Sequence, residues 1–176
     1  RGSADFSSMV AVGNSLTAGF QSNALSAEGQ ENSLPNIIAK QLNQAGSGVF
    51  TQPLIPGESG VKGVGLSALL PPGVVAPELV LRLAANCQGV VGPAPQLGST
   101  PYSGAEFFAN IGANGPYNNV GVPGARVTHL NFVGYGSAQG NPYFARFAAN
   151  AGETMLQAAM RNNPTFFQLW IGNNDV

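Results

Sequence analysis

Residues 165–171 form a short and almost wholly apolar run, T-F-F-Q-L-W-I, with Pro164 before it and Gly172-Asn173 after it. A run of this length, rich in aromatic and branched side chains, predicts a β-strand that needs cover on both of its faces. Strands of that kind belong to parallel sheets that carry helices on both sides. The segment therefore favours an α/β architecture.

Two further segments predict strands of the same sheet. Residues 8–12, S-M-V-A-V, are followed by Gly13-Asn14, and residues 117–122, Y-N-N-V-G-V, are followed by Pro123-Gly124. Short apolar runs that end in glycine-containing turns are typical of buried strands. The alternation of these strands with helical segments predicts βαβ units and a parallel sheet.

Two segments carry helical signals. In the first, Ser33 is a start signal, Ile37, Ile38 and Leu42 are expected to share an apolar face, and Gly46 is a stop signal. The second segment covers residues 152–161, and Pro164 follows it. Its predicted apolar face consists of Met155, Leu156, Ala159 and Met160.

Residues 48–115 have a different sequence pattern, because prolines separate short apolar segments throughout this stretch. We interpret them as a loop-rich insertion with room for one hairpin, which would shape or cover a binding cleft. We therefore expect residues 4–176 to form a single domain that contains the insertion at about 48–115. Residues 1–3 are interpreted as a vector-derived scar. Since residues 172–176 give no helix or strand after the run at 165–171, the domain is expected to be incomplete at its C-terminus.

Composition excludes several classes of function. Charged residues make up 9% of the 176 residues and the net charge is −1, so no basic stripe is available for nucleic acid. No His, Cys, Asp and Glu cluster has metal-ligand spacing, so neither a metal nor another cofactor is expected. The low charge and the many Gly and Asn residues are associated with exported bacterial proteins, whether periplasmic, on the cell surface or secreted.

The first candidate site is G-N-S-L-T-A-G at residues 13–19. Ser15 would lie at the carboxyl end of a strand, where open parallel sheets bind their ligands, and it would start a helix whose N-terminus favours negative charge. A serine in such a turn is also a common helix cap. The motif is not the G-x-S-x-G elbow of α/β-hydrolases, because Thr17 stands where the second glycine would be.

Two more motifs follow predicted strands. In N-V-G-V-P-G-A at residues 119–125, Gly124 would let a backbone N–H approach a ligand without a side chain in the way, although a plain turn glycine explains it equally. In G-N-N-D at residues 172–175, Asn174 and Asp175 supply an amide and a carboxylate, or simply an Asx-rich turn.

In this order, the three motifs resemble the first three blocks of the SGNH, or GDSL-type, serine hydrolases. The resemblance implies a flavodoxin-like three-layer α/β/α sandwich with a parallel sheet. It makes Ser15 the nucleophile and assigns the oxyanion hole to the Ser15 N–H, the Gly124 N–H and the Asn174 amide. Asn14 stands where the family usually has Asp and would shape the turn, while Asp175 would hold the third loop by hydrogen bonding.

The family's fourth block, D-x-x-H, is absent from the sequence. The only histidine, His129, lies five residues beyond Gly124, where we expect a partly exposed helical residue and not the catalytic base. Since a serine without a base is a weak nucleophile, the chain alone is expected to be nearly inactive.

The resemblance implies a serine ester hydrolase, either a lipase or esterase or a carbohydrate esterase, that acts through an acyl-serine on a small-molecule or lipid ester. Its base would come from a further segment of the same protein. Two alternatives stay open at this point. One is a non-catalytic binding module or an inactive truncated form of the same fold, and the other is a structural surface protein whose turns imitate the motifs.

Overall fold

The three predicted strands lie side by side in one parallel sheet of the computed structural model, which describes residues 2–22, 24–56, 61–62, 79–97, 109–137 and 139–176. Strand β1 (Met9–Gly13) lies in the middle, with β6 (Asn119–Gly121) on one side and β7 (Phe166–Trp170) on the other. At the carboxyl end of β1, Gly13 pairs with Gly121 and Trp170. The predicted mixed α/β architecture with a parallel sheet is confirmed.

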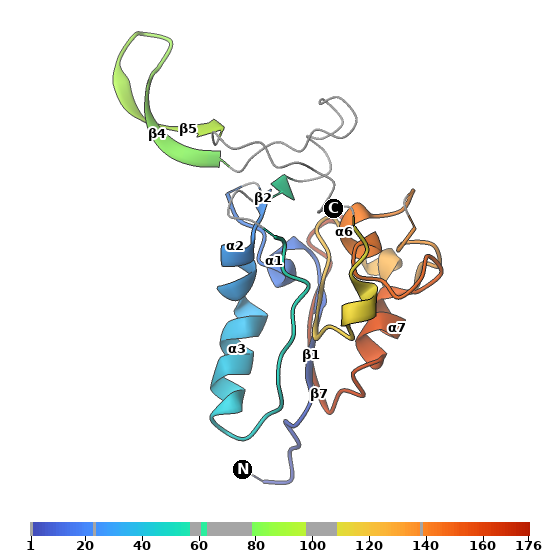
Figure 1. Cartoon of the computed structure of the whole chain (residues 1–176). Coiled ribbons are helices and arrows are strands. Elements are labelled where there is room, and N and C mark those ends of the chain that lie inside the picture. Colours follow the sequence, from blue (N-terminus) through green and yellow to red (C-terminus); the bar gives the residue numbers. More distant parts are fainter. Residues whose placement is uncertain (1, 23, 57–60, 63–78, 98–108, 138) are drawn as a thin grey trace.

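Helices lie on both sides of this sheet. Figure 1 shows α2 and α3 on one side of β1 and β7, and α6 and α7 on the other. The helical elements are α1 (Ser15–Ala18), α2 (Ala27–Glu31), α3 (Leu34–Asn43), η1 (Gly112–Asn114), η2 (Val127–Asn131), α6 (Pro142–Ala145) and α7 (Met155–Met160). Most of them are short, and none in the described part of the chain is long and apolar enough to cross a membrane.

The core fills the space between the sheet and the α6 and α7 side. Its fully buried side chains include Val10 of β1, Val120 of β6, Phe144 of α6 and Met155 of α7. Alternate residues of a strand point to opposite faces, and the valines of β1 at positions 10 and 12 both join this core. Apolar burial thus adds to the backbone hydrogen bonds between strands that are distant in sequence.

Helix α3 begins after Ser33 and ends before Gly46, as predicted. Its buried residues are Pro35 and Ala39, however, and Ile37 is 48% exposed, so the prediction that Ile37 belongs to the packed face is wrong. The reason is angular. With 3.6 residues per turn, the stripe through Pro35, Ala39 and the half-buried Leu42 leaves position 37 on the opposite flank.

Helix α7 is shorter than predicted, because Thr154 caps it. The Thr154 hydroxyl accepts from the backbone N–H of Gln157, and the Gln157 side chain accepts from the N–H of Thr154, which makes a capping box. The buried residues of α7 are Met155, Ala158 and Ala159, at spacing i, i+3 and i+4. Met160 falls outside this stripe and is 62% exposed, so its predicted place in the apolar face is wrong.

Strand β7 is covered only in part. Phe167 is 64% exposed and Leu169 is also exposed, so within the described residues the strand is not covered on both faces. Phe167 and Leu169 are in register with Val10 and Val12 and therefore point to the same face as these core residues. Their exposure comes from the position of β7 at the edge of the described sheet, because no residue of β7 belongs to the described core.

The stretch at 48–115 contains the predicted hairpin, formed by β4 (Leu79–Ala85) and β5 (Val91–Leu97). A shorter antiparallel pair joins β2 (Ala24–Leu25) to β3 (Val61–Lys62). The beginning of the stretch belongs to the body of the domain, because Ile55 is buried in the core. The rest of the expected insertion at 57–60, 63–78 and 98–108 lies outside the described residues.

Candidate functional site

The three sequence motifs meet at the carboxyl edge of the sheet. Because β1, β6 and β7 run parallel, the loops that follow them leave from the same edge. These motif loops are residues 14–19 after β1, residues 122–126 after β6 and residues 171–175 after β7. This edge is where ligands bind in open α/β sheets.

Asn14 organises the first motif loop. It is completely buried, and its side-chain oxygen accepts from the backbone N–H of Leu16 at 3.0 Å, which caps α1. Its own backbone N–H donates to the carbonyl of Trp170 at the end of β7. The cap is therefore Asn14, and the half-buried Ser15 is left as the first residue of α1, with no capping role.

Helix α1 lies directly against the backbone of β6. An added Cβ on Gly121 would meet the Ala18 nitrogen at 2.3 Å, so only glycine fits there. The side-chain amide of Asn119 also donates to the carbonyl of Thr17 at 3.1 Å. These contacts fix the helix that carries Ser15 relative to the second strand.

Gly124 lies in the second motif loop with a φ of +80°, a conformation that glycine adopts without strain. It is exposed, and a Cβ built on it would have only the Asn141 side chain nearby, at 3.9 Å. The loop begins at Val122, whose N–H donates to the carbonyl of Gly13 at 2.9 Å. The first and second loops are thus joined through the end of β1.

Side chains of the third motif loop join all three loops together. Asn173 accepts from the Asn14 side-chain amide at 3.1 Å, and the Asn174 amide donates to the carbonyl of Ala125 at 2.8 Å. The Asp175 carboxylate accepts from the N–H of Val127 at 3.1 and 3.2 Å. Each of these three consecutive residues therefore binds one of the other two loops or the start of η2.

Two of these interactions bear on the predicted roles. Asp175 makes a loop-holding hydrogen bond, of the kind that the resemblance implies. Asn174 donates one hydrogen of its amide to the carbonyl of Ala125, and an NH₂ group carries two, so among the described residues the second hydrogen has no protein acceptor. The role of Asn173 was not anticipated from the sequence, which assigned function only to its neighbour.

His129 lies in the 3₁₀ helix η2 and is half-buried, as expected for a partly exposed helical residue. Its Nδ1 accepts from the N–H of Arg126 at 3.1 Å, and its ring stacks on Tyr135 with the centroids 4.4 Å apart. Among the described residues, no hydrogen bond joins it to Ser15. Burial and then the Arg126 charge lower its pKa, against a smaller opposing effect of Asp175. The ring is accordingly neutral at pH 7, with its proton on Nε2.

A groove of about 380 Å³ begins at Gly124. This volume falls within the range of roughly 300 to 1,000 Å³ that is usual for small-molecule sites. Its apolar and aromatic lining is formed by Pro123, His129, Phe132, Tyr135 and Pro142. The aromatic residues 132, 135, 143, 144 and 147 divide between this groove and the core, as predicted, whereas 107 and 108 lie outside the described residues.

Asn141 supports this groove and was missed by the sequence analysis. It is buried and caps α6, because its side-chain oxygen accepts from the N–H groups of Tyr143 and Phe144. Its amide donates to the Pro123 carbonyl and to the Tyr135 hydroxyl, each at 2.9 Å. The dipeptide Asn141-Pro142 is a helix-start signal that would have revealed the cap.

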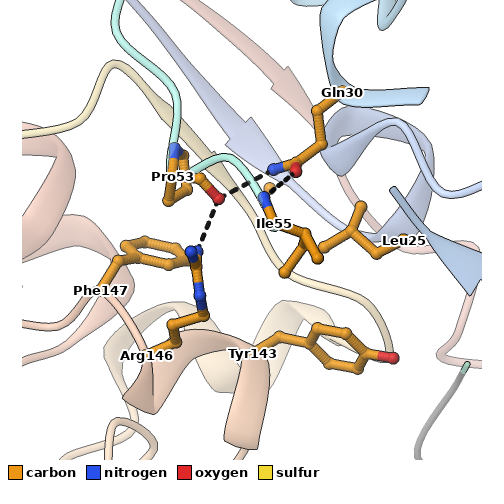
Figure 2. Close-up of a pocket in the computed structure, with 8 residues that line it drawn as sticks. Leu25, Gln30, Pro53, Ile55, Tyr143, Arg146 and Phe147 are labelled. Atoms are coloured by element: carbon orange, nitrogen blue, oxygen red, sulfur yellow. Dashed lines mark hydrogen bonds between the residues drawn. The ribbon is translucent and has the colours of Figure 1, made fainter. Parts of the chain in front are cut away.

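A second cavity, shown in Figure 2, is too small for a ligand. Its volume is about 10 Å³, which is close to the space of a single water. Its polar side chains bind backbone groups: Gln30 and Arg146 both donate to the carbonyl of Pro53, and Gln30 also accepts from the N–H of Ile55. This cluster holds residues 53–55 against the body of the domain.

The described residues contain no group of three or more His, Cys, Asp or Glu side chains that could hold a metal ion. Comparison of the chain with family models, with curated proteins and with solved structures gives no match. The arrangement of the three motif loops and the groove beside them is therefore the basis for assigning a function.

Proposed function

We propose that this chain carries the nucleophile and the oxyanion hole of a serine ester hydrolase of the SGNH type. The observation that supports the proposal is the hydrogen bonding of the three motif loops at one edge of the sheet, through Asn14, Asn173, Asn174 and Asp175. The proposal requires the three motifs to meet at one place, and these hydrogen bonds are what that requirement leads us to expect.

The strand order supports the finer fold assignment. Numbered by their place among the parallel strands, β6, β1 and β7 lie in the order 2-1-3, which is how the flavodoxin-like order 2-1-3-4-5 begins. We propose that the domain is a flavodoxin-like α/β/α sandwich. The departure at Asn14 is compatible with this, because an amide can cap α1 through its oxygen as an Asp would.

In the proposed reaction, the Ser15 hydroxyl attacks the ester carbonyl, and the hydroxyl proton passes to a base. The carbonyl oxygen becomes an oxyanion that accepts from the Ser15 and Gly124 N–H groups and from the second hydrogen of the Asn174 amide. Donors of this kind are each worth about 3 to 4 kcal/mol of transition-state stabilisation. The alcohol then leaves, and water hydrolyses the acyl-serine.

We propose that the base is a His and Asp pair outside these 176 residues, in a further segment of the same protein. His129 is poorly suited to the task, because its Nδ1 is occupied by Arg126 and its ring is stacked on Tyr135. The substrate would be a small-molecule or lipid ester. Export from a bacterial cell stays part of the proposal.

The same observation on His129 favours a second candidate function. If no other base acts on Ser15, the three loops would form a binding module that recognises an ester or carboxylate without cleaving it. The hydrolase requires that Ser15 be acylated when a base is supplied, whereas a module that only binds does not require it.

The test supplies that base as free imidazole. The full chain is incubated with p-nitrophenyl acetate with and without imidazole, and acetyl groups are located by peptide mass spectrometry. We expect imidazole-dependent acetylation of Ser15, which Ser15→Ala abolishes. Ser137→Ala is the matched control, because Ser137 is also half-buried but lies outside the motif loops.

The expected result for Ser137→Ala is acetylation at Ser15 at the rate of the unchanged chain. Acetylation of Ser15 no faster than that of other serines would refute the nucleophile assignment. It would then favour the binding module.

A further inference from the structure

We propose that the groove beside Gly124 binds an alkyl group next to the ester carbonyl, on its acyl or its alcohol side, so that the protein selects medium-chain esters over acetylated sugars. This inference rests on the proposed function for the position of the carbonyl. The existence of an apolar binding groove can be tested without any catalysis.

The groove starts where the carbonyl oxygen is proposed to lie. Gly124 is both a wall of the groove and the proposed donor to the oxyanion. Ala125, the next residue, accepts from the Asn174 amide, which brings the other proposed donor to the same end of the groove. A group bound in the groove would therefore lie next to the reacting carbonyl.

The walls of the groove are aromatic and already packed together. The rings of His129 and Tyr135 are stacked, and the ring of Phe132 meets Tyr135 edge to face, with the centroids 6.4 Å apart. Phe132 is nevertheless 53% exposed. A bound alkyl chain would remove apolar surface from water without first separating these rings, which favours binding.

Most polar side-chain atoms of the groove already have hydrogen-bond partners within the protein. The Asn141 amide donates to Pro123 and Tyr135, and its side-chain oxygen accepts from the start of α6. His129 Nδ1 is bonded to Arg126. Among the described side chains that line the groove, the donors left are the Nε2–H of His129 and the hydroxyl hydrogen of Tyr135, and none of these side chains is a carboxylate, a lysine or an arginine. A sugar has several hydroxyls that would lose water without gaining partners, which penalises its binding.

The experiment measures binding of uncleavable amides to the full chain by NMR, with the amide signals of Gly124 and Gly140 as reporters. N-methyloctanamide and N-heptylacetamide are isomers that carry the same heptyl chain on the acyl side or on the alcohol-equivalent side. N-methylacetamide is the short reference. A fully buried methylene contributes roughly four-fold in affinity, so a heptyl chain in an open groove should bind at least about ten-fold more tightly than the reference.

A matched pair of variants locates the binding. Phe132→Ser removes an aromatic wall and should lose most of the chain-length preference. Val133→Ser alters the neighbouring side chain, which is 69% exposed and does not line the groove, and should bind within about two-fold of the unchanged chain. Both positions are exposed, so both variants should fold.

The outcomes separate this inference from the proposed function. Tight binding of either isomer supports the groove and shows which side of the ester it holds, and the same binding in Ser15→Ala would be expected. Equal affinity for all three amides, or equal losses in the two variants, would overturn the inference even if Ser15 is acylated. Chain-length preference without acylation of Ser15 would keep the groove and refute the hydrolase.

Discussion

The hydrogen bond between Asn14 and Asn173 can be tested by a double-mutant cycle, because it is the link between the first and third motif loops. Asn14→Ala removes two interactions. The loss of the α1 cap costs about 1 kcal/mol, and the loss of the bond to Asn173 costs about 1 kcal/mol more. We therefore expect Asn14→Ala to lower the free energy of unfolding by about 2 kcal/mol.

Asn173→Ala should cost less, because Asn173 is exposed and its replacement mainly leaves the buried amide of Asn14 without an acceptor. An unsatisfied buried donor costs about 1 to 1.5 kcal/mol here, within the usual range. In the Asn14→Ala background this cost disappears, since no donor is left to satisfy. The double variant should thus be about as unstable as Asn14→Ala alone, which is a coupling energy of about 1 kcal/mol.

The measurement is urea unfolding followed by circular dichroism, with the four proteins of the cycle compared at one pH. For a domain of this size each kcal/mol also shifts the melting temperature by about 2 to 4 °C. Asn131→Ala, at an exposed position outside the three loops, is the control and should change stability by less than about 0.5 kcal/mol. Additive effects of Asn14→Ala and Asn173→Ala would refute the bond and weaken the case that the loops are joined.

Two further predictions concern packing and charge at the same edge. Gly121→Ala should prevent stable folding or lower the free energy of unfolding by more than about 3 kcal/mol, because the new Cβ meets the backbone of α1 at 2.3 Å. Gly92→Ala is the control: its new Cβ has open space, so thermal unfolding should be nearly unchanged. His129 should titrate below its usual value of about 6.5 in a proton NMR experiment, and Arg126→Gln should move its pKa upward. Because the folded-state pKa is lowered, this histidine should destabilise the fold as pH falls below about 6.5, and an upward shift of its pKa would contradict the burial argument.

The sheet was predictable from the sequence because its signals are local. Each strand is a short apolar run that ends in a glycine-containing turn, and three such runs predict one parallel sheet. The helix faces were less predictable, since Ile37 and Met160 are as hydrophobic as the residues that are buried beside them. Which flank of a helix is buried depends on the tertiary docking of the helix, which the local pattern specifies only within one or two positions.

The candidate site was predictable only in part. Motifs identified Ser15, Gly124 and Asn174, but no sequence pattern assigns the partners of Asn173 and Asn14, which are 159 residues apart. The groove was not predictable either. Its walls come from a 3₁₀ turn and from loops whose shape depends on Asn141, a buried side chain with partners in three different segments.

The hydrogen bonds of the motif loops have a consequence for catalysis that does not depend on the source of the base. Electrostatic stabilisation is effective when the donors are already oriented before charge develops. The bond from Asn174 to Ala125 restrains the side-chain amide, which limits the directions that its second hydrogen can take. The proposed oxyanion hole is thus organised by contacts within this chain alone. A supplied base should then be sufficient for acylation of Ser15, and a failure of added imidazole to promote it would refute the proposed oxyanion hole.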